Sequence, residues 1–208
     1  MTIVETGARL HFGFQNLSLA HDRLYGGVGV GLASPTVVVE ATPASTVQCD
    51  DPAVEPYARQ AVEAVGVPGA RVYVHERFDR HVGLGSGTQL ALACLVAVAQ
   101  THDRAINPRV VAPAVGRGGR SGVGVATFET AGFVIDAGHP TERFTTAPPD
   151  TGEWRVPAPI VRRPLPASWR FVLVVPEAAP GLSGQGRLKV CTPPSRAPLR
   201  RLPTRLAC

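Results

Sequence analysis

Hydrophobic and polar residues follow two different periods along the first half of the chain. Apolar side chains alternate with polar ones in residues 2–13, 36–41 and 71–77, which is the period of a half-buried β-strand. Residues 52–65 instead place apolar side chains at helical spacing, and Gly66 follows as a helix-ending residue. The pattern predicts three strands and one amphipathic surface helix.

A second helix is predicted over residues 86–100, where nearly every position is apolar. A helix that is apolar on all sides is buried between other elements. Ser86 and Gln89 have the spacing of a capping box, which predicts how this helix begins.

The second half of the chain is less regular. Asn107 predicts the N-cap of a third helix that ends near Gly116. Residues 132–137 and 169–176 have the character of strands, and the proline-rich residues 138–167 predict a loop. Strands and helices that mix without a strict βαβ rhythm favour an α+β fold over a doubly wound sheet.

The segment between the third strand and the second helix has glycine at positions 83, 85 and 87. A strand, a glycine loop and a helix N-terminus leave backbone N–H groups at the positive end of the helix dipole, and glycine lets an anion approach them. The pattern favours a seat for phosphate or pyrophosphate. On the glycines alone, a tight turn that needs glycine only for its backbone angles is an equal alternative.

Two further segments are rich in glycine. Residues 26–31 contain four glycines, which predicts a bend or a close approach of the backbone to another element. Residues 116–125 combine five glycines with Arg117 and Arg120, a composition suited to bidentate contact with a phosphate or carboxylate. A solvated loop explains these residues equally well.

Charge separates the last 24 residues from the rest. The net charge of +5 arises from residues 185–208, which hold six basic residues and no acidic one, whereas the remainder has 15 basic and 16 acidic residues. A basic footprint confined to one terminal segment argues against a nucleic-acid-binding domain. We see neither a signal peptide nor a run of about 18 apolar residues, so we expect a cytoplasmic protein without a membrane partner. The four cysteines lack C-x-x-C spacing, and Cys94 in the apolar helix is expected to be a core thiol.

Taken together, the three glycine segments resemble the GHMP kinase superfamily. The segment His81-Val82-Gly83-Leu84-Gly85-Ser86-Gly87-Thr88 resembles its phosphate-loop motif. Residues 8–13 with 23–29, and residues 116–124 with Glu129 and 132–136, complete a set that is similar to the beta-ribofuranosylaminobenzene 5'-phosphate synthase family over residues 4–184. The resemblance implies an α+β GHMP-type N-terminal domain, a fold shared with a ribosomal protein domain, followed by a ferredoxin-like domain.

The resemblance also implies a reaction. Phosphoribosyl would pass from phosphoribosyl pyrophosphate to the ring carbon of 4-aminobenzoate or 4-hydroxybenzoate, with release of CO2 and pyrophosphate, in tetrahydromethanopterin biosynthesis. Mg2+ is expected to accompany the pyrophosphate. A homodimer is left open.

An ATP-dependent small-molecule kinase of the same superfamily is the alternative. Sugar-type kinases of this superfamily carry an Asp shortly after the Ser-Gly pair of the third motif, which is Ser121-Gly122 here, and an acidic magnesium ligand upstream. Here that position is Gly124, and residues 104–128 contain no acid. Because phosphoryl transfer to a hydroxyl depends on a positioned base and a carboxylate-held metal, this composition favours the synthase.

Roles for individual residues follow from the motifs and the resemblance. The expected phosphate-binding residues are Gly83, Leu84, Gly85, Ser86, Gly87, Thr88, Arg117 and Arg120, with the hydroxyls of Ser86 and Thr88 near the metal. The candidates for substrate binding are Arg9, His11, Arg23, Tyr25, Gly26, Gly27 and Ser121. His11 and His81 are equally well explained as ordinary hydrogen-bonded histidines, and Glu129 as a structural partner of a loop arginine. No general base is assigned.

The chain is predicted to divide at residues 165 and 184. Residues 1–165 would form the glycine-loop domain and 166–184 the start of the ferredoxin-like domain, with its first strand. Residues 185–208 form a proline-rich basic tail that cannot bury enough apolar surface to fold. A reading-frame shift near Gly184 would explain this change. The product would then be a truncated synthase, and an inactive phosphate-binding fragment is a third candidate function.

Overall fold

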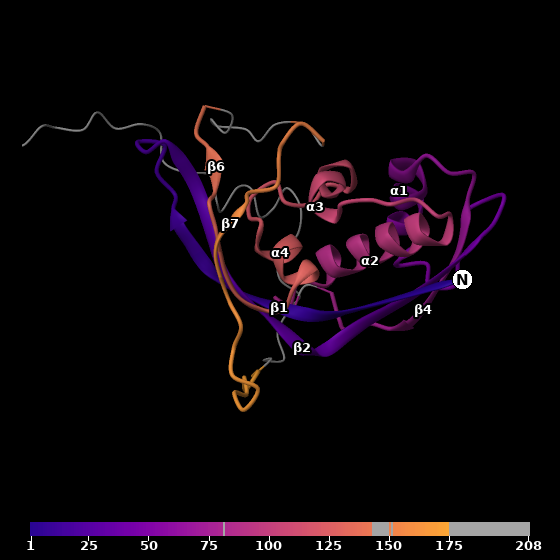
Figure 1. Ribbon diagram of the computed structural model, residues 1–208, viewed down its shortest axis with the longest axis horizontal. Helices are drawn as coiled ribbons and strands as arrows, with labels where there is room; N and C mark the ends of the chain where they lie inside the picture. Colours follow the sequence, from indigo (N-terminus) through magenta and orange to yellow (C-terminus); the bar gives the residue numbers. More distant parts are fainter. Residues whose placement is uncertain (81, 143–149, 151, 175–208) are drawn as a thin grey trace, which may run out of the picture.

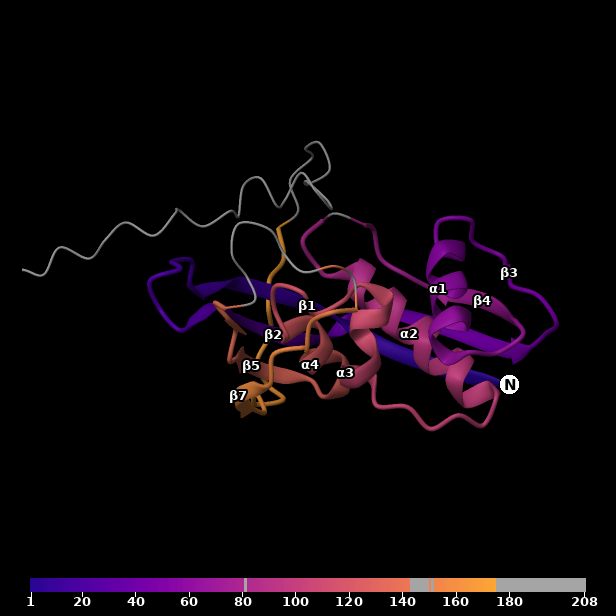
Figure 2. The same cartoon turned by 90° about the horizontal axis from the view of Figure 1, so that it is seen from above.

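The computed structural model describes residues 1–80, 82–142, 150 and 152–174 of the 208-residue chain. One curved, largely antiparallel sheet carries the helices on a single face (Figures 1 and 2). This arrangement confirms the predicted α+β class.

Two long strands, β1 (Thr2–Asn16) and β2 (Arg23–Pro43), pair antiparallel, with breaks in register between Gly7 and Arg9 and between His11 and Gly13. The other edge of β2 is shared, because β4 (Ala70–Glu76) pairs with its C-terminal half and β5 (Gly132–Asp136) with its N-terminal half. Three short strands complete the pairing: β3 (Gln48–Cys49) beside β4, β6 (His139–Pro140) beside the start of β2, and β7 (Pro159–Arg163) beside β5.

Helices α1 (Glu55–Val65) and α2 (Ser86–Thr101) pack against each other and against the sheet. Leu90, Leu92 and Leu95 of α2 are completely buried, which confirms that this apolar helix lies between other elements. Further along the chain come α3 (Pro108–Val111), the 3-10 helix η1 (Ala112–Val115) and α4 (Val123–Glu129). Asn107 caps α3 by accepting a hydrogen bond from the backbone N–H of Arg109, as predicted.

The capping box predicted at the start of α2 is wrong. The N-cap is Gly85, with φ 80°, and no side chain caps the helix. Gln89 instead accepts a hydrogen bond from the Thr6 hydroxyl at 2.9 Å and donates one to the carbonyl of Gly124 at 3.1 Å, and it is fully buried. A buried amide satisfies its partners inside the protein before it serves a helix terminus, so Gln89 joins β1, α2 and α4.

The glycines of β2 allow α4 and the segment before it to approach the strand, as the glycine-rich pattern predicted. A Cβ on Gly27 would lie 2.0 Å from Ser121 Oγ, and one on Gly29 2.6 Å from a methyl carbon of Val123. These distances are shorter than any side chain can tolerate, so glycine is required where the helix segment crosses the sheet.

Two predictions for residues 138–176 are wrong. The proline-rich region contains β7, whose partner is β5, because tertiary pairing overrides the local composition. No strand is assigned to residues 169–174, where the exposed fractions of Phe171, Val172, Leu173 and Val174 alternate at 39, 88, 37 and 85%. The backbone there is not paired with any described strand, which a ladder requires.

Several predictions concern residues outside the described part of the chain. These are His81, the end of the predicted strand at 175–176, the boundary near Gly184 and the basic tail at 185–208. Among the described residues, no helix combines the length and hydrophobicity that a bilayer crossing requires.

Candidate functional site

The glycine loop (residues 83–88) turns from its lead-in segment into α2. Gly83 and Gly85 have φ values of 87° and 80°, a left-handed conformation that favours glycine. Arg9 of β1 lies against this loop: its backbone N–H donates to the carbonyl of Leu84 at 2.9 Å and its Nη1 to that of Gly83 at 3.4 Å. Arg9, predicted from its motif as a substrate residue, is thus located beside the predicted phosphate residues.

The first turn of α2 presents backbone donors. The N–H groups of Thr88 and Gln89 return to the carbonyl of Gly85, but within the described residues no acceptor is recorded for those of Ser86 and Gly87. The Ser86 side chain is buried, and Thr88 packs on α4, 3.1 Å from where a Cβ on Gly124 would lie. Backbone N–H groups that lack an acceptor at the positive end of a 16-residue helix are suited to bind an anion.

Arg117 reaches this helix terminus from the arginine loop (residues 116–122). A Cβ on Gly87 would lie 3.7 Å from Arg117 Nη1 and 3.3 Å from the hydroxyl of Tyr57. The Arg117 guanidinium carbon lies 5.4 Å from the centre of the Tyr57 ring, and that of Arg80 lies 5.6 Å from the same centre. Both distances are in the cation–π range, so Tyr57 holds two arginines beside the glycine loop.

Arg117 is a desolvated cation. Burial lowers the pKa of its guanidinium and the charge of Arg80 acts in the same direction, while Tyr57 opposes them. Its Nε is buried and has no hydrogen-bond partner in the described part of the chain. Such a group is stabilised by an incoming anion, which supplies both the missing acceptor and the missing charge.

The oxygen ligands near the glycine loop fit Mg2+ only when the ion is already bound to a polyphosphate. Within the described residues no three His, Cys, Asp or Glu side chains gather to hold a metal. Mg2+ usually binds through one or two carboxylates together with substrate phosphates and retained water. The hydroxyls of Ser86 and Thr88 would therefore meet an ion already carried by a polyphosphate, rather than a resident metal.

Three predicted site residues make structural contacts away from this loop. Arg23 donates to the backbone carbonyls of Ala137 and Gly138. The hydroxyl of Ser121 donates to Asp136 at 2.8 Å, and Gly27 is required by their close approach. For Arg120 no side-chain interaction is recorded among the described residues.

Asp136 is the carboxylate at the end of β5, and it is fully buried. Its Oδ2 accepts from the Ser121 hydroxyl and from the N–H of Gly122 at 2.7 Å, and its Oδ1 from the N–H of Gly138 at 2.8 Å. Ser121 Oγ in turn accepts from the N–H of Val123 at 3.1 Å. This carboxylate therefore holds the start of α4 and is not placed as an accessible base.

A row of aromatic rings extends from His11. Its ring centre lies 4.9 Å from that of Phe14, Phe14 lies 5.2 Å from Tyr25, and Tyr25 meets His139 edge-on at 6.4 Å. Tyr25 has φ 71°, and Gly26, with φ 74°, admits the Gln15 side chain beside it. The predicted substrate residues His11, Tyr25 and Gly26 thus come together, whereas Arg9 is beside the glycine loop.

His139 is buried at the far end of this row, with 2% of its surface exposed. Burial lowers its pKa to about 4, so the imidazole is neutral near pH 7. Its Nε2 lies 3.0 Å from the carbonyl of Gly118, and the indole Nε1 of Trp154 donates to the carbonyl of Arg117 at 2.9 Å. Two side chains therefore hold the backbone of the arginine loop.

Sequence comparisons with known proteins agree with the resemblance to the GHMP superfamily. Residues 53–132 match the family model of the GHMP kinases N-terminal domain. Over 213 aligned residues the chain is 35% identical to the beta-ribofuranosylphenol 5'-phosphate synthase of Methanothermobacter thermautotrophicus, with 95% of this chain and 65% of the relative covered. This chain is a homologue of the beta-ribofuranosylphenol 5'-phosphate synthases of the GHMP superfamily.

A second synthase of the same name, from Archaeoglobus fulgidus, is 33% identical over 85% of this chain and 58% of its own length. The synthase homologue therefore spans less than two thirds of these curated relatives. Its fold is similar to that of Streptococcus pneumoniae phosphomevalonate kinase, with a TM-score of 0.51, 11% identity, and coverage of 68% of this chain and 49% of the kinase. For a 4-(cytidine 5'-diphospho)-2C-methyl-D-erythritol kinase the values are 0.50, 18%, 76% and 55%. At these identities the likeness shows the fold alone, the GHMP kinase N-terminal domain.

Glu129 of the synthase homologue is a structural partner, but not of a loop arginine. Its carboxylate binds Arg109 at 2.7 Å and Arg162 at 2.5 Å. These pairs join α3, α4 and β7. The structural role that the sequence left open is therefore the observed one, with different partners.

Sequence reasoning missed four side chains. Tyr57 lies four positions before Ala61 on the buried face of α1, and Arg80 directly precedes the phosphate-loop motif, so both carried a weak signal. His139 and Trp154 lie in the proline-rich region, where no pattern distinguishes them from loop residues. Their placement depends on contacts with the arginine loop.

Proposed function

We propose that the chain provides the phosphate-binding part of a phosphoribosyl-transferring synthase. In this reaction an aromatic acid displaces pyrophosphate from phosphoribosyl pyrophosphate, and CO2 is released. The relatives' name specifies a ribofuranosylphenol product, so 4-hydroxybenzoate is the first acceptor to test and 4-aminobenzoate the second. In this proposal the reaction belongs to tetrahydromethanopterin biosynthesis, as the resemblance implies.

The arginine-flanked and carboxylate-poor start of α2 carries this proposal. Arg9 and Arg117 contact or overlie the glycine loop, and Arg80 shares the Tyr57 ring with Arg117. The nearby carboxylate, Asp136, is buried and accepts three hydrogen bonds from its own chain. Cations without a carboxylate base are suited to hold a departing pyrophosphate, and they are poorly suited to phosphoryl transfer to an alcohol.

The bond changes need no general base at the ring. The ring carbon that bears the carboxylate donates an electron pair to C1 of the ribose, and the bond from C1 to the pyrophosphate oxygen breaks with its pair. The bond to the carboxylate carbon then breaks, which returns its electron pair to the ring and releases CO2. Loss of CO2 takes the place of proton loss, so the proposed step does not depend on a carboxylate base at the ring.

The groups around the glycine loop would act on the leaving pyrophosphate. The unfilled N–H groups of α2 and the guanidinium of Arg117 would bind the pyrophosphate oxygens and stabilise the charge that develops there. Arg9 would orient the glycine loop through its contacts with Leu84 and Gly83. Mg2+ bound to pyrophosphate would neutralise part of the same charge, with the Ser86 and Thr88 hydroxyls beside it.

The test uses the chain with phosphoribosyl pyrophosphate, Mg2+ and 4-hydroxybenzoate labelled in its carboxyl carbon. We expect release of labelled CO2 that depends on phosphoribosyl pyrophosphate and is reduced at least 100-fold in Arg117→Ala. Arg104→Gln, at an exposed loop position, is the matched control. ATP-dependent phosphorylation of small alcohols without CO2 release would overturn the proposal in favour of a kinase.

Phosphate binding without turnover is the second candidate. The first turn of α2 and the guanidinium of Arg117 offer donors to an anion, and binding alone requires no further group. Binding of pyrophosphate without CO2 release from either aromatic acid would support this candidate. A longer homologue assayed in parallel shows whether the reaction conditions are adequate.

A further inference from the structure

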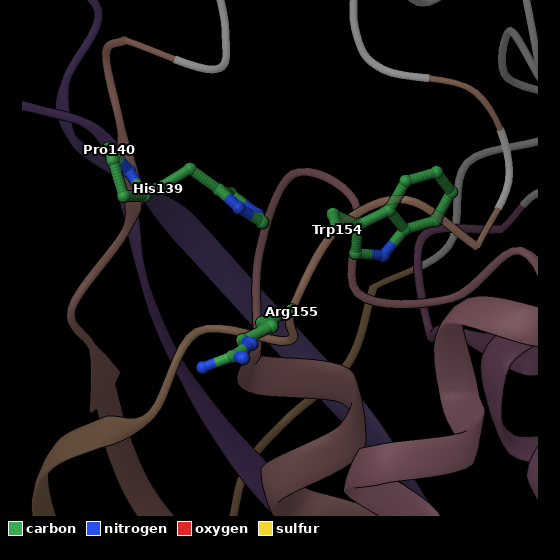
Figure 3. A pocket seen from close by; sticks show the side chains of 4 residues that line it. All are labelled: His139, Pro140, Trp154 and Arg155. Carbon is green, nitrogen blue, oxygen red and sulfur yellow. The ribbon is translucent and has the colours of Figure 1, made fainter.

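A pocket of about 310 Å3 lies beside the arginine loop, and its lining residues are His139, Pro140, Trp154 and Arg155 (Figure 3). His139 and Pro140 come from β6, and Trp154 and Arg155 from the segment that leads to β7. The volume is at the lower end of the range for small-molecule sites, so it fits a ligand with a single ring.

The lining combines apolar rings with one cation. Trp154 is half-buried and Pro140 adds an apolar surface, while His139 is neutral near pH 7. Arg155 is exposed, and the described residues offer it no recorded partner. One guanidinium beside flat apolar groups is suited to a ligand with one carboxylate and one aromatic ring.

The same lining disfavours a phosphate group. A phosphate dianion is usually held by several converging donors, often at a helix N-terminus. Those donors are gathered at the start of α2, whereas the pocket supplies a single charged side chain. The start of α2 and the pocket are therefore suited to different ligands.

The pocket and the anion site share a wall. Trp154 donates to the carbonyl of Arg117, and His139 bonds to the carbonyl of the next residue, Gly118. The Arg117 side chain points from this same segment to the first turn of α2. A ligand in the pocket and an anion at the glycine loop would thus both contact groups that belong to, or are bonded to, this one segment.

We propose that this pocket binds the aromatic acid acceptor, a para-substituted benzoate, with its carboxylate on Arg155 and its ring among His139, Pro140 and Trp154. The assignment rests on the proposed function for the identity of the acid, and it adds a binding site and two residues that the motifs do not contain. Arg155 is a specificity-determining residue, because it distinguishes an acid from a neutral ring of the same shape.

The experiment measures binding without turnover. Trp154 is made the sole tryptophan by Trp169→Phe, at an exposed position, and its fluorescence is titrated with 4-hydroxybenzoate and with the uncharged 4-hydroxybenzamide, each with and without pyrophosphate. We expect quenching by both ligands, with the benzoate at least tenfold tighter. Arg155→Gln should remove this tenfold preference and leave amide binding unchanged, whereas Arg104→Gln should change neither.

Equal affinity for the acid and the amide, an unchanged preference in Arg155→Gln, or no response of Trp154 with either ligand would overturn the assignment. Failure of this proposal is distinguishable from failure of the proposed function. If wild-type protein releases labelled CO2 and Arg155→Gln leaves KM for the acid unchanged, the function stands and the pocket assignment is wrong. If benzoate binds with the expected preference and no CO2 is released, the pocket stands and the transfer reaction is wrong.

Discussion

The N-terminus of α2 lies beside Arg117 of the arginine loop and that of α4 follows this loop directly, and different side chains lie at the two termini. At α4, the carboxylate of Asp136 accepts from the N–H of Gly122, and the hydroxyl of Ser121 accepts from that of Val123. At α2, no described side chain accepts a hydrogen bond from the first turn, and the cation of Arg117 lies beside it instead. A protein that fills one helix terminus with its own acid and surrounds the other with arginines reserves the second for an external anion.

Removing the internal acid tests the α4 side of this comparison and should have the largest effect. Asp136→Ala leaves three donors without their charged acceptor in a buried place, so we expect the free energy of unfolding to fall by about 3–5 kcal/mol. Urea denaturation followed by circular dichroism measures this loss. Asp150→Ala, at an exposed position, should change it by less than about 0.5 kcal/mol. A loss in Asp136→Ala no larger than in that control would show that α4 does not depend on its acid.

The pH dependence of stability tests whether the arginine loop is held by a buried, neutral His139. His139 has a folded-state pKa of about 4, below the value near 6.5 of an unfolded histidine, so the unfolded chain binds the extra proton between these values. Stability should therefore fall as pH is lowered from 7.5 to 4.5, by about 2–3 kcal/mol from this residue. The difference between wild type and His139→Gln isolates the contribution, because other titrating groups cancel. His21→Gln, at an exposed position, controls for removal of a histidine. An equal pH slope in wild type and His139→Gln would contradict the buried neutral state.

Pyrophosphate affinity tests the proposed anion site at α2. It also distinguishes Arg117 from Arg120, which the sequence predicted equally as phosphate-binding residues. The structure brings Arg117 to Gly87, whereas no side-chain contact of Arg120 is recorded in the described part of the chain. Loss of a charged hydrogen-bond donor costs about 1.5–3 kcal/mol, so Arg117→Ala should weaken binding at least tenfold. Arg120→Ala should weaken it less than threefold. Isothermal titration calorimetry at constant salt measures both, and equal losses would show that the anion contacts both arginines.

Local sequence signals identified the elements that depend on local chemistry. The strands β1 and β4 and the helix α1 follow hydrophobic periods, α2 is marked by its nearly continuous apolar sequence, and the glycines of β2 predicted a close approach. By contrast, α4 contains valine, threonine and glycine, which have low helix propensity, and it forms where an aspartate from β5 holds its first turn. The strand β7 likewise requires β5 beside it. Such elements are determined by residues far away in the chain, which no local pattern reveals.

The candidate site divides in the same way. Motif spacing and side-chain type pointed to the glycine loop and to Arg117, which the structure brings together, and their binding of phosphate stays a prediction. Tyr57 and Trp154 were not, because an aromatic residue in a helix or a loop is equally consistent with the core. For Gln89 the sequence predicted a role that the structure does not show. Its spacing fits a capping box, but its buried amide hydrogen-bonds to Thr6 and Gly124 instead. The contacts of Ser121 and Arg23 also required the fold, and their predicted role in binding substrate stays a prediction.

One peptide segment connects the two halves of the site. The carbonyl of Arg117 is held by Trp154 and that of Gly118 by His139, while the side chain of Arg117 lies at α2. A ligand that moves Trp154 must therefore move the backbone from which Arg117 extends. Thermodynamic linkage makes such an influence reciprocal: any change that a ring compound causes in the affinity for pyrophosphate is returned, by the same factor, in the affinity for the ring compound.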